Sequence, residues 1–510
     1  MQQSGRSHRV LEIDGRSLTL SDVEDVARRR IIEFSLTPQA RQRMDRSRQR
    51  VLELIEADAT VYGVNTGFGH FASVRVDHHR LHELQLNLVR SHAAGTGEIL
   101  PAQVVRPLML LRANVLGHGN SGVRPLLVDH LLELLSRDIL PLVPRQGSVG
   151  ASGDLVPLAH VALLLIGEGK AWVEGELVGG AQALERAGLE PVRLQAKEGL
   201  ALLNGTQLMT SLGTLTCREL EDLCVVADIA GALCLEALAG QVSAFDPVAA
   251  ALRPHQGQID AAEHLVSLLE GSELADRADQ QKVQDAYSLR CMPQVHGASR
   301  DVCRVAREIL EVEINSVTDN PVILDDGRVV ACGNFHGQPV AFALDWLAIA
   351  ACDLASISER RINRMVNPNL SGLPAFLVVD GGLRSGLLMT QTVAAALVSE
   401  SRGLAVPAST DNIPTSADQE DHVSMGAWGG WKAWQAVANC RRVLAIELLC
   451  AREAMKLQAP ALPAPKLRRA IDWLDQMVAP LTADRPLAGD IRRLDESLLE
   501  GELLRSMAAK

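Results

Sequence analysis

Aromatic residues are scarce in this sequence. Phenylalanine, tryptophan and tyrosine together make up 3% of its 510 residues, and the chain has two tyrosines, Tyr62 and Tyr287. The nine cysteines form no CxxC pair, which argues against a zinc site and against a disulfide framework. The net charge is −12 and no long basic run occurs, which argues against nucleic acid as the main partner. We therefore expect a reduced, cytoplasmic protein without a bound metal.

Long uncharged apolar runs are also missing. No stretch of about 18 apolar residues lacks a charge, and the nearest to one, residues 341–357, is interrupted by Asp345 and Asp353. The N-terminal segment "MQQSGRSHRVLEIDGRSLTL" is polar and charged, unlike a secretory signal. We expect neither a membrane span nor a secretory leader.

Helical periodicity dominates what is present. Apolar residues recur at intervals of three and four over residues 127–135 and 344–355, and the second pattern stops near Asn367-Pro368. Residues 207–240 and 429–455 are rich in alanine and leucine on several sides, as in helices at the centre of a bundle. The sequence therefore predicts a mainly α protein.

Strand signals are short, at residues 171–178 and 331–335 at most. Glycine-rich segments cluster in the first 205 residues, and the longest helical patterns follow them. We place a boundary there, between an N-terminal domain of residues 1–205 and a helical domain of residues 206–510. A proline-rich linker at residues 460–465 precedes a last amphipathic helix.

One glycine-rich stretch, "GSVGASGDLVPLAH" at residues 147–160, contains no recognisable nucleophile–base pair. Within it, Gly153 lacks a Cβ, so its amide nitrogen can approach the carbonyl carbon of Ala151. Ring closure and loss of two waters, one of them from the Ser152 hydroxyl, would leave a five-membered ring with an exocyclic methylene, which is a strong electrophile. On its own, Ala-Ser-Gly is a common tripeptide, and an ordinary glycine-rich loop is the simpler interpretation.

The full string resembles the signature of the aromatic amino acid ammonia-lyases, which form 4-methylidene-imidazol-5-one (MIO) from Ala-Ser-Gly. Further blocks resemble the family in the family's own order: "YGVNTGFG", "LQLNLVRSHAAG", "LLNGTQ", "VQDAYSLRCMPQVHG", "NSVTDNP", "CGNFHGQP" and "DQEDHVSMG". They span the chain from residue 62 to residue 451. Such broad agreement favours the reactive tripeptide over the ordinary loop.

The resemblance implies a fold, a prosthetic group and an assembly. Family members are mainly α, with an N-terminal domain that carries the group and a long antiparallel helical bundle, in a fumarase/aspartase-like architecture. Here Ala151, Ser152 and Gly153 would supply the MIO, with no external cofactor. The family also implies an amino acid substrate and a homotetramer whose active sites are each built from more than one subunit.

Both tyrosines fall inside these blocks. A tyrosine, with a pKa of about 10, is a poor base unless its anion is stabilised, but the resemblance makes Tyr62 the base that removes the substrate β-proton. It makes Arg290 the partner of the substrate carboxylate, a role for which the planar guanidinium is well suited. By resemblance, Tyr287 and Asn204 assist at the prosthetic group and at the substrate amine or carboxylate. Tyr287 and Arg290 would share a face if their segment is helical.

Gln284 and Phe335 match further pocket positions of the family. The positions that indicate which amino acid is the substrate are His92 and Glu420. The pair Ser91-His92 resembles that of histidine-specific members, and Glu420 stands where phenylalanine lyases have glutamine. A carboxylate can accept the N–H of an imidazole but would be stranded against a phenyl ring. We therefore expect non-oxidative deamination of L-histidine to trans-urocanate and ammonia.

Three alternatives remain open. A tyrosine or phenylalanine ammonia-lyase, or an MIO-dependent aminomutase, would use the same chemistry, and the unusual Val406, Asp418 and Ala286 bear on that choice. The string "GHGNSG" at residues 117–122 matches a nucleotide-binding pattern, although it follows a helical run and not a strand. An inactive helical scaffold would require a defect in the reactive positions, and these are intact.

Overall fold

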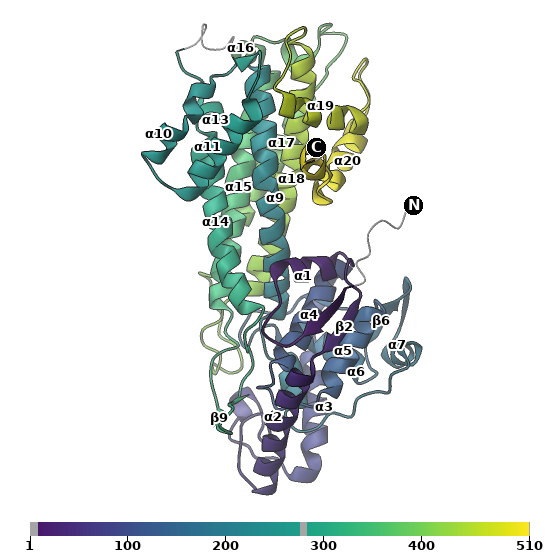
Figure 1. The fold of residues 1–510 in the computed structure, drawn as a ribbon. Coiled ribbons are helices and arrows are strands. Elements are labelled where there is room, and N and C mark those ends of the chain that lie inside the picture. Colours follow the sequence, from purple (N-terminus) through teal and green to yellow (C-terminus); the bar gives the residue numbers. More distant parts are fainter. Residues whose placement is uncertain (1–8, 276–282, 509–510) are drawn as a thin grey trace. The chain divides into compact units, whose positions relative to one another are not determined.

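The computed structural model describes residues 9–275 and 283–508, and helices dominate it (Figure 1). The prediction of a mainly α protein is confirmed. The chain divides into two compact units. The first unit runs to Leu215 and regains Arg307–Leu344 and Pro407–Trp431, while the second comprises the segments between and after these. The single boundary near residue 205 stays a prediction about domains.

The first unit holds many helices of moderate length. Helix α1 begins with a capping box, in which the side chains and backbones of Thr19 and Asp22 satisfy one another. Helix α2 begins with a Thr37 cap and a proline at its first position. The helices of this unit are α1 (Leu20–Ala27), α2 (Pro38–Glu56), α3 (Leu81–His92), α4 (Ala102–Gly117), α5 (Leu126–Ser136), α6 (Leu155–Leu165), α7 (Gly180–Ala187) and α8 (Glu198–Leu203), with the short η1 (Gly69–Phe71) and η2 (His78–Arg80).

Strands form small sheets only, in the part of the chain that is described. They are β1 (Val10–Ile13) parallel to β2 (Glu33–Leu36), β3 (Thr96–Ile99) with β5 (Pro144–Gln146), β4 (Leu140–Pro141) with β6 (Lys170–Val173) and β7 (Glu176–Gly179), and β8 (Val322–Ile323) with β9 (Val329–Val330). The signal at residues 171–178 is confirmed as the β6–β7 hairpin, which turns through positive φ at Glu174 and Gly175. The signal at 331–335 is wrong, because β9 ends at Val330 and the Cys332 amide is bonded to the Asn320 side chain.

Long helices make up most of the second unit (Figure 1). Four of the five boundaries between the units fall within helices, and the fifth lies between Val406 and Pro407, outside any helix; the four helices are α9 (Gln207–Ala237), α14 (Met292–Glu313), α15 (Gln338–Val366) and α18 (Gly426–Lys456). The other helices are α10 (Pro247–Ala251), α11 (Gln256–Leu269), α13 (Tyr287–Arg290), α16 (Pro368–Ser371), α17 (Leu388–Leu404), α19 (Pro465–Met477), α20 (Ala488–Leu499) and α21 (Glu502–Ala508), with η3 (Val242–Phe245) and η4 (Ala375–Leu377). Two helices follow α19, so the expectation that it is the last helix is wrong.

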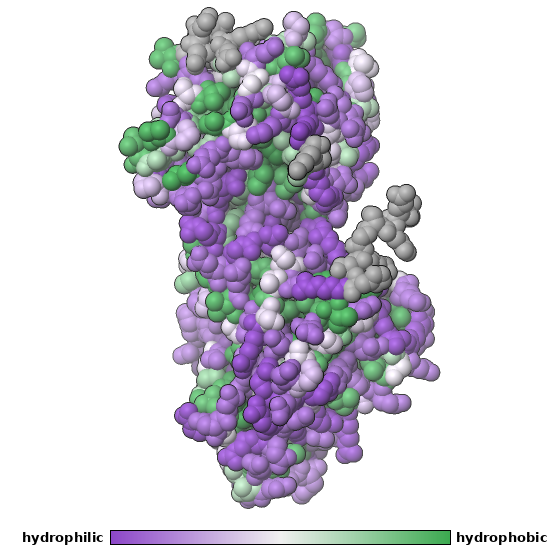
Figure 2. All heavy atoms as spheres, viewed as in Figure 1, coloured by the Kyte–Doolittle hydropathy of each residue, from purple (hydrophilic) through white to green (hydrophobic). Residues whose placement is uncertain are grey.

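Helix α15 is long and apolar enough to cross a membrane by length and composition. However, 61% of its most apolar window is buried inside the protein, as in a core helix. Its Asp345 forms an ion pair with Lys432, whose ammonium lies 3.7 Å away. Figure 2 shows hydrophilic residues over most of the face in view, so much of the apolar surface of the helices is turned inward on that side.

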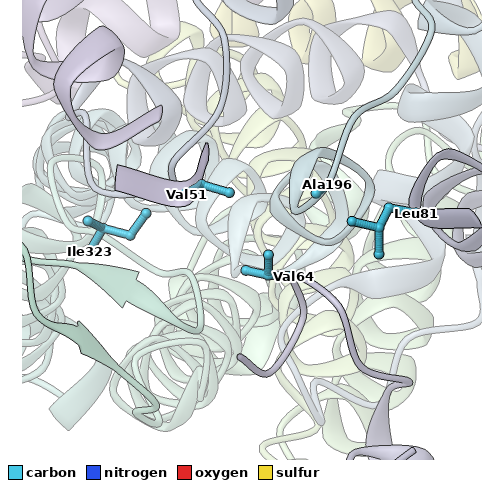
Figure 3. Close-up of a cluster of buried hydrophobic side chains, with 5 residues drawn as sticks. All are labelled: Val51, Val64, Leu81, Ala196 and Ile323. Carbon is cyan, nitrogen blue, oxygen red and sulfur yellow. The ribbon is translucent and has the colours of Figure 1, made fainter. Parts of the chain in front are cut away.

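A small buried cluster in the first unit anchors several loops (Figure 3). It joins Val51 of α2 to Val64, Leu81, Ala196 and Ile323, all of which are at most 6% exposed. Val64 lies within the block "YGVNTGFG" and Ile323 follows the block "NSVTDNP" by two residues, so burial of these two side chains helps to fix the position of both blocks in the first unit.

Candidate active site

The reactive tripeptide lies in the loop between β5 and α6, where its third residue is pressed against another backbone. Gly153 has a φ of +71°, and a Cβ built on it would lie 2.2 Å from the Gly205 carbonyl oxygen. The same oxygen accepts a 2.7 Å hydrogen bond from the Asp154 amide. A side chain at position 153 would therefore break this approach, so the turn needs glycine on two separate grounds.

The buried side chain of Asp154 holds the end of this turn in place. Its carboxylate is fully buried and accepts hydrogen bonds from the Ser148 hydroxyl at 3.0 Å and from the Met209 amide at 3.0 Å. Burial raises the pKa of Asp154 to about 6, although these hydrogen bonds favour the charged form. The turn is thus tied both to the segment before it and to the start of α9.

A cavity of about 680 Å³ opens beside the tripeptide, within the first unit. It collects residues from blocks that are widely separated in the sequence. Of the predicted site residues, it is lined by Tyr62, His92, Ala151, Ser152, Asn204, Phe335 and Glu420.

His92 ends α3 and lies partly buried in the cavity wall. Its Nδ1 lies 2.9 Å from the Leu88 carbonyl oxygen. Because a carbonyl can only accept, Nδ1 carries the hydrogen and Nε2 keeps its lone pair in the neutral ring. Burial lowers the pKa of His92, which favours the neutral form. His92 therefore offers the cavity an acceptor at Nε2.

Glu420 is presented by a tight loop closed by paired backbone hydrogen bonds between Thr415 and Glu420. Its carboxylate accepts from the Thr415 hydroxyl at 2.7 Å and from the Ser152 hydroxyl at 3.2 Å. The loop tip holds Ser416, Ala417 and Asp418 at φ values of 55°, 53° and 63°. Successive left-handed residues other than glycine store strain, which is typical of functional sites.

Tyr62 lies in the glycine-rich loop opposite, and its ring contacts Phe68 edge-on with centroids 6.4 Å apart. Burial raises the pKa of Tyr62, and the charges of Glu420 and Asp319 raise it further. A hydrogen bond from the Gly69 backbone opposes this shift. The cavity of one chain therefore does not by itself make Tyr62 a strong base at neutral pH.

Three predicted residues lie elsewhere. Gln284, Tyr287 and Arg290 belong to the second unit, and none is among the described residues that line the cavity. Tyr287 and Arg290 share the short helix α13, as expected, and the Arg290 guanidinium lies 4.7 Å from the centre of the Tyr287 ring. Tyr287 is 71% exposed, an unusual position for one of two tyrosines in the chain.

Several lining residues were not predicted from the sequence. His336 and His422 stack at the cavity with ring planes 3° apart, and the His336 Nε2 lies 3.2 Å from the His422 carbonyl oxygen. His336 stands in the block "CGNFHGQP" and His422 in "DQEDHVSMG", so their place in these blocks could have marked both histidines as candidate site residues. Asn320, in "NSVTDNP", also lines the cavity.

The three unusual positions, Val406, Asp418 and Ala286, are not among the described residues that line the cavity. Val406 is 62% exposed, and its carbonyl accepts from Lys432. Ala286 precedes α13 with a φ of −64°, which proline would also adopt. The string at residues 117–122 follows α4, a helix, which removes the context that a nucleotide-binding loop requires.

The comparisons with known proteins agree with this geometry. A family model described as aromatic amino acid lyase matches residues 18–476. A histidine ammonia-lyase of Symbiobacterium thermophilum is 52% identical over 498 residues, covering 97% of this chain and 98% of that protein. One from Anaeromyxobacter sp. (strain K) is 52% identical over 507 residues, covering 97% and 99%.

Solved structures show the same architecture. The histidine ammonia-lyase of Trypanosoma cruzi matches with a TM-score of 0.92 and 39% identity, covering 98% of this chain and 95% of that one. The tyrosine aminomutase of Streptomyces globisporus matches with a TM-score of 0.93 and 38% identity, covering 98% of each chain. The chain belongs to the aromatic amino acid lyase family. Its fold is shared by lyases and aminomutases, so its substrate has to be argued from the site.

Proposed function

We propose that this chain is a histidine ammonia-lyase that converts L-histidine to trans-urocanate and ammonia, without oxidation, in the cytoplasm. The observation that carries the proposal is the pairing of His92 and Glu420 in the cavity beside Ala151 and Ser152. The relatives named histidine ammonia-lyase, at 52% identity over nearly the whole chain, support it.

The two side chains suit an imidazole for a simple reason. The Nε2 of His92 and the carboxylate of Glu420 are both acceptors, and an imidazolium has two N–H groups to satisfy them. A phenol offers one O–H and a phenyl ring offers none, so either would leave a partly buried acceptor unpaired. The pair therefore selects a nitrogen heterocycle among aromatic amino acids.

The tripeptide fits the prosthetic group that the family implies. Gly153 is held by Gly205 and Asp154 in a turn that excludes a side chain, which is what close approach of its nitrogen to the Ala151 carbonyl requires. Residues 151–153 would form the MIO, which would supply an electrophile able to activate the substrate amine as a leaving group. The Ser152 hydroxyl is lost when this ring forms, which leaves the Glu420 oxygen available to an imidazole N–H.

Proton removal falls to Tyr62. Its raised pKa means that the working site must add a cation or further donors near the phenol oxygen. Arg290, which holds the substrate carboxylate in this proposal, brings a positive charge that the cavity lining does not contain within the described chain.

A homotetramer with shared sites accounts for that missing charge. Gln284, Tyr287 and Arg290 would enter the cavity of a neighbouring copy, with Tyr287 acting at the prosthetic group and Gln284 at the substrate. Apolar residues are exposed on long helices of the second unit, including Ile349 at 44% and Met389 at 60%. Exposed apolar side chains on helices favour burial against other helices.

A substrate panel tests the function. Histidine, phenylalanine and tyrosine are offered in parallel, and formation of the conjugated acid is followed with product analysis for β-amino acids. We expect the wild type to prefer histidine. The triple variant Ser91→Phe/His92→Leu/Glu420→Gln should have a kcat/KM for histidine that is lower by roughly 10- to 100-fold, because a hydrogen bond to a charged group is worth about 1.5–3 kcal/mol. Preference of the wild type for tyrosine or phenylalanine, or a β-amino acid product, would contradict the proposal.

A further inference from the structure

Asn204 lines the cavity with its carboxamide in a defined orientation. It follows α8 and is 2% exposed. Its Nδ2 donates to the Asp319 carboxylate at 3.3 Å and to the Asn320 carbonyl at 3.1 Å. Both partners are acceptors, so the nitrogen must face them and the oxygen must face away.

The side-chain oxygen of Asn204, Oδ1, is then a hydrogen-bond acceptor available to a donor from the substrate. Among the described residues, Oδ1 is buried and makes no hydrogen bond. A substrate carboxylate cannot satisfy it, because a carboxylate is itself an acceptor. An amine N–H can, so the geometry favours the substrate amine over the carboxylate as the group that Asn204 contacts.

Behind Asn204 lies a completely buried ion pair. The Lys197 ammonium lies 2.8 Å from the Asp319 carboxylate, and both side chains are 0% exposed. Lys197 adopts a φ of +73° just before α8, which an L-residue seldom does. A buried ion pair is weak evidence for stability, because removing two charges from water is costly. A specific use for this carboxylate explains the pair better.

We infer that Lys197 and Asp319 are positioning residues that hold the Asn204 carboxamide with its oxygen toward the substrate amine. The inference rests on the proposed function for its amino acid substrate. An ionised Asp319 can only accept, which fixes the Asn204 nitrogen on its side. A neutral Asp319 could donate to the Asn204 oxygen and so turn the carboxamide over, presenting a donor to the amine.

Three titratable side chains interact with the Asp319 carboxylate in the described part of the chain. Lys197 contacts it directly, whereas Arg112 of α4 and Tyr62 interact with it electrostatically at longer range. Arg112 is itself fully buried and donates to the Asn204 carbonyl at 3.0 Å. Lys197 is therefore the cation in direct contact with the Asp319 carboxylate, while Arg112 fixes the Asn204 backbone.

The chain offers a matched control for this carboxylate. Glu198, beside Lys197, is also completely buried and pairs with Arg124 at 2.7 Å, and within the described part of the chain its carboxylate makes no hydrogen bond with Asn204. Asp319→Asn and Glu198→Gln therefore make the same chemical change in the same part of the unit. We expect Asp319→Asn to lower kcat/KM roughly 10- to 100-fold, as for other groups that orient a ligand-binding side chain, and Glu198→Gln to lower it by less than about threefold.

Intact mass and oligomeric state are measured for both variants. Loss of two waters and wild-type assembly in Asp319→Asn would place the defect after maturation. Equal losses of activity in the two variants, or failure of ring formation in Asp319→Asn alone, would overturn the inference in favour of a structural role. The comparison uses whichever amino acid the wild type turns over, so failure of the histidine assignment does not decide it.

The variant Lys197→Met gives a second, independent readout. Without the ammonium, Asp319 loses the partner that holds its carboxylate beside the Asn204 amide nitrogen. We expect Lys197→Met to lower kcat/KM roughly as much as Asp319→Asn, and the double variant to lower it no further, because residues that act as one unit are not additive. Losses that multiply in a double variant of wild-type mass and assembly would overturn the inference.

Discussion

Gly153 combines two constraints that can be separated by mutation. It shares a left-handed φ with Gly188, +71° against +69°, but a Cβ at Gly153 would meet the Gly205 backbone whereas one at Gly188 would meet nothing within 4 Å. Gly153→Ala should therefore lose ring formation, while Gly188→Ala should suffer only the left-handed strain of about 1–3 kcal/mol.

Intact mass spectrometry distinguishes these outcomes. Wild type and Gly188→Ala should each show the loss of two waters from the chain, and Gly153→Ala should show the full mass and almost no activity. An unmodified mass in active wild-type enzyme, or a dehydrated mass in Gly153→Ala, would refute the assignment of the ring to residues 151–153.

Residues inside recognisable blocks could be found from the sequence, and residues defined by burial could not. Tyr62, His92 and Glu420 stand in blocks whose order matches a family, so their meeting in one cavity follows from the shared fold. The Lys197–Asp319 pair spans 122 positions and has no local pattern. Its meaning depends on both side chains being removed from water, which only the packed structure shows.

At the scale of elements, long periodic helices were predictable and short or aperiodic ones were not. The pattern over residues 344–355 lies inside α15, which ends at Val366 beside the expected stop at Asn367-Pro368. The pair Val329–Val330 carries too little signal to locate β9, and the cysteine and glycine after it were mistaken for strand. Side chains from distant segments, such as that of Asn320, decide such short elements.

Four long helices of the second unit are joined by a buried polar chain. His296 of α14 places Nδ1 2.7 Å from the Asp228 carboxylate of α9 and Nε2 3.1 Å from the Arg361 guanidinium of α15. Arg361 in turn pairs with Glu447 of α18. Because arginine only donates, Nε2 must accept, and His296 is neutral in the folded protein.

Protonation of His296 should therefore destabilise the bundle. Burial lowers the pKa of His296 below its usual value, so below about pH 6.5 the unfolded chain takes up a proton that the folded chain resists. Stability is full above that pH and falls as the pH is lowered, by at most about 1.4 kcal/mol per pH unit. His296→Gln cannot titrate, so its thermal midpoint should depend less steeply on pH between about 6.5 and 5.

His264→Gln is the matched control. His264 contacts the other oxygen of the same carboxylate at 2.7 Å, from a position where its side chain is 32% exposed. This variant removes a hydrogen bond to Asp228 but keeps His296, so it controls for the loss of a contact with this carboxylate. Identical pH slopes in wild type and His296→Gln would show that His296 is not the titrating group.

At the scale of the whole molecule, neither unit is a single continuous segment of the sequence. Residues 307–344 and 407–431 rejoin the first unit, and four of the five changes of unit fall inside helices whose periodicity has no break. A boundary drawn from glycine content cannot detect this. The same division separates Arg290 from Tyr62, although the proposed reaction needs both near one substrate.

Mixing two inactive variants tests how the site is completed. Tyr62→Phe removes the proposed base from the cavity, and Arg290→Ala removes the carboxylate partner, which does not line that cavity within the described chain. If each site takes Tyr62 from one subunit and Arg290 from another, co-expression in equal amounts should leave roughly a quarter of the sites with both residues intact, by random assortment in a symmetric oligomer. Activity should then exceed that of either variant alone. Separately purified variants that are mixed without exchange of subunits provide the baseline. If one chain supplies both residues to its own site, every site in the mixed oligomer carries one defect, and co-expression should give no more activity than that baseline.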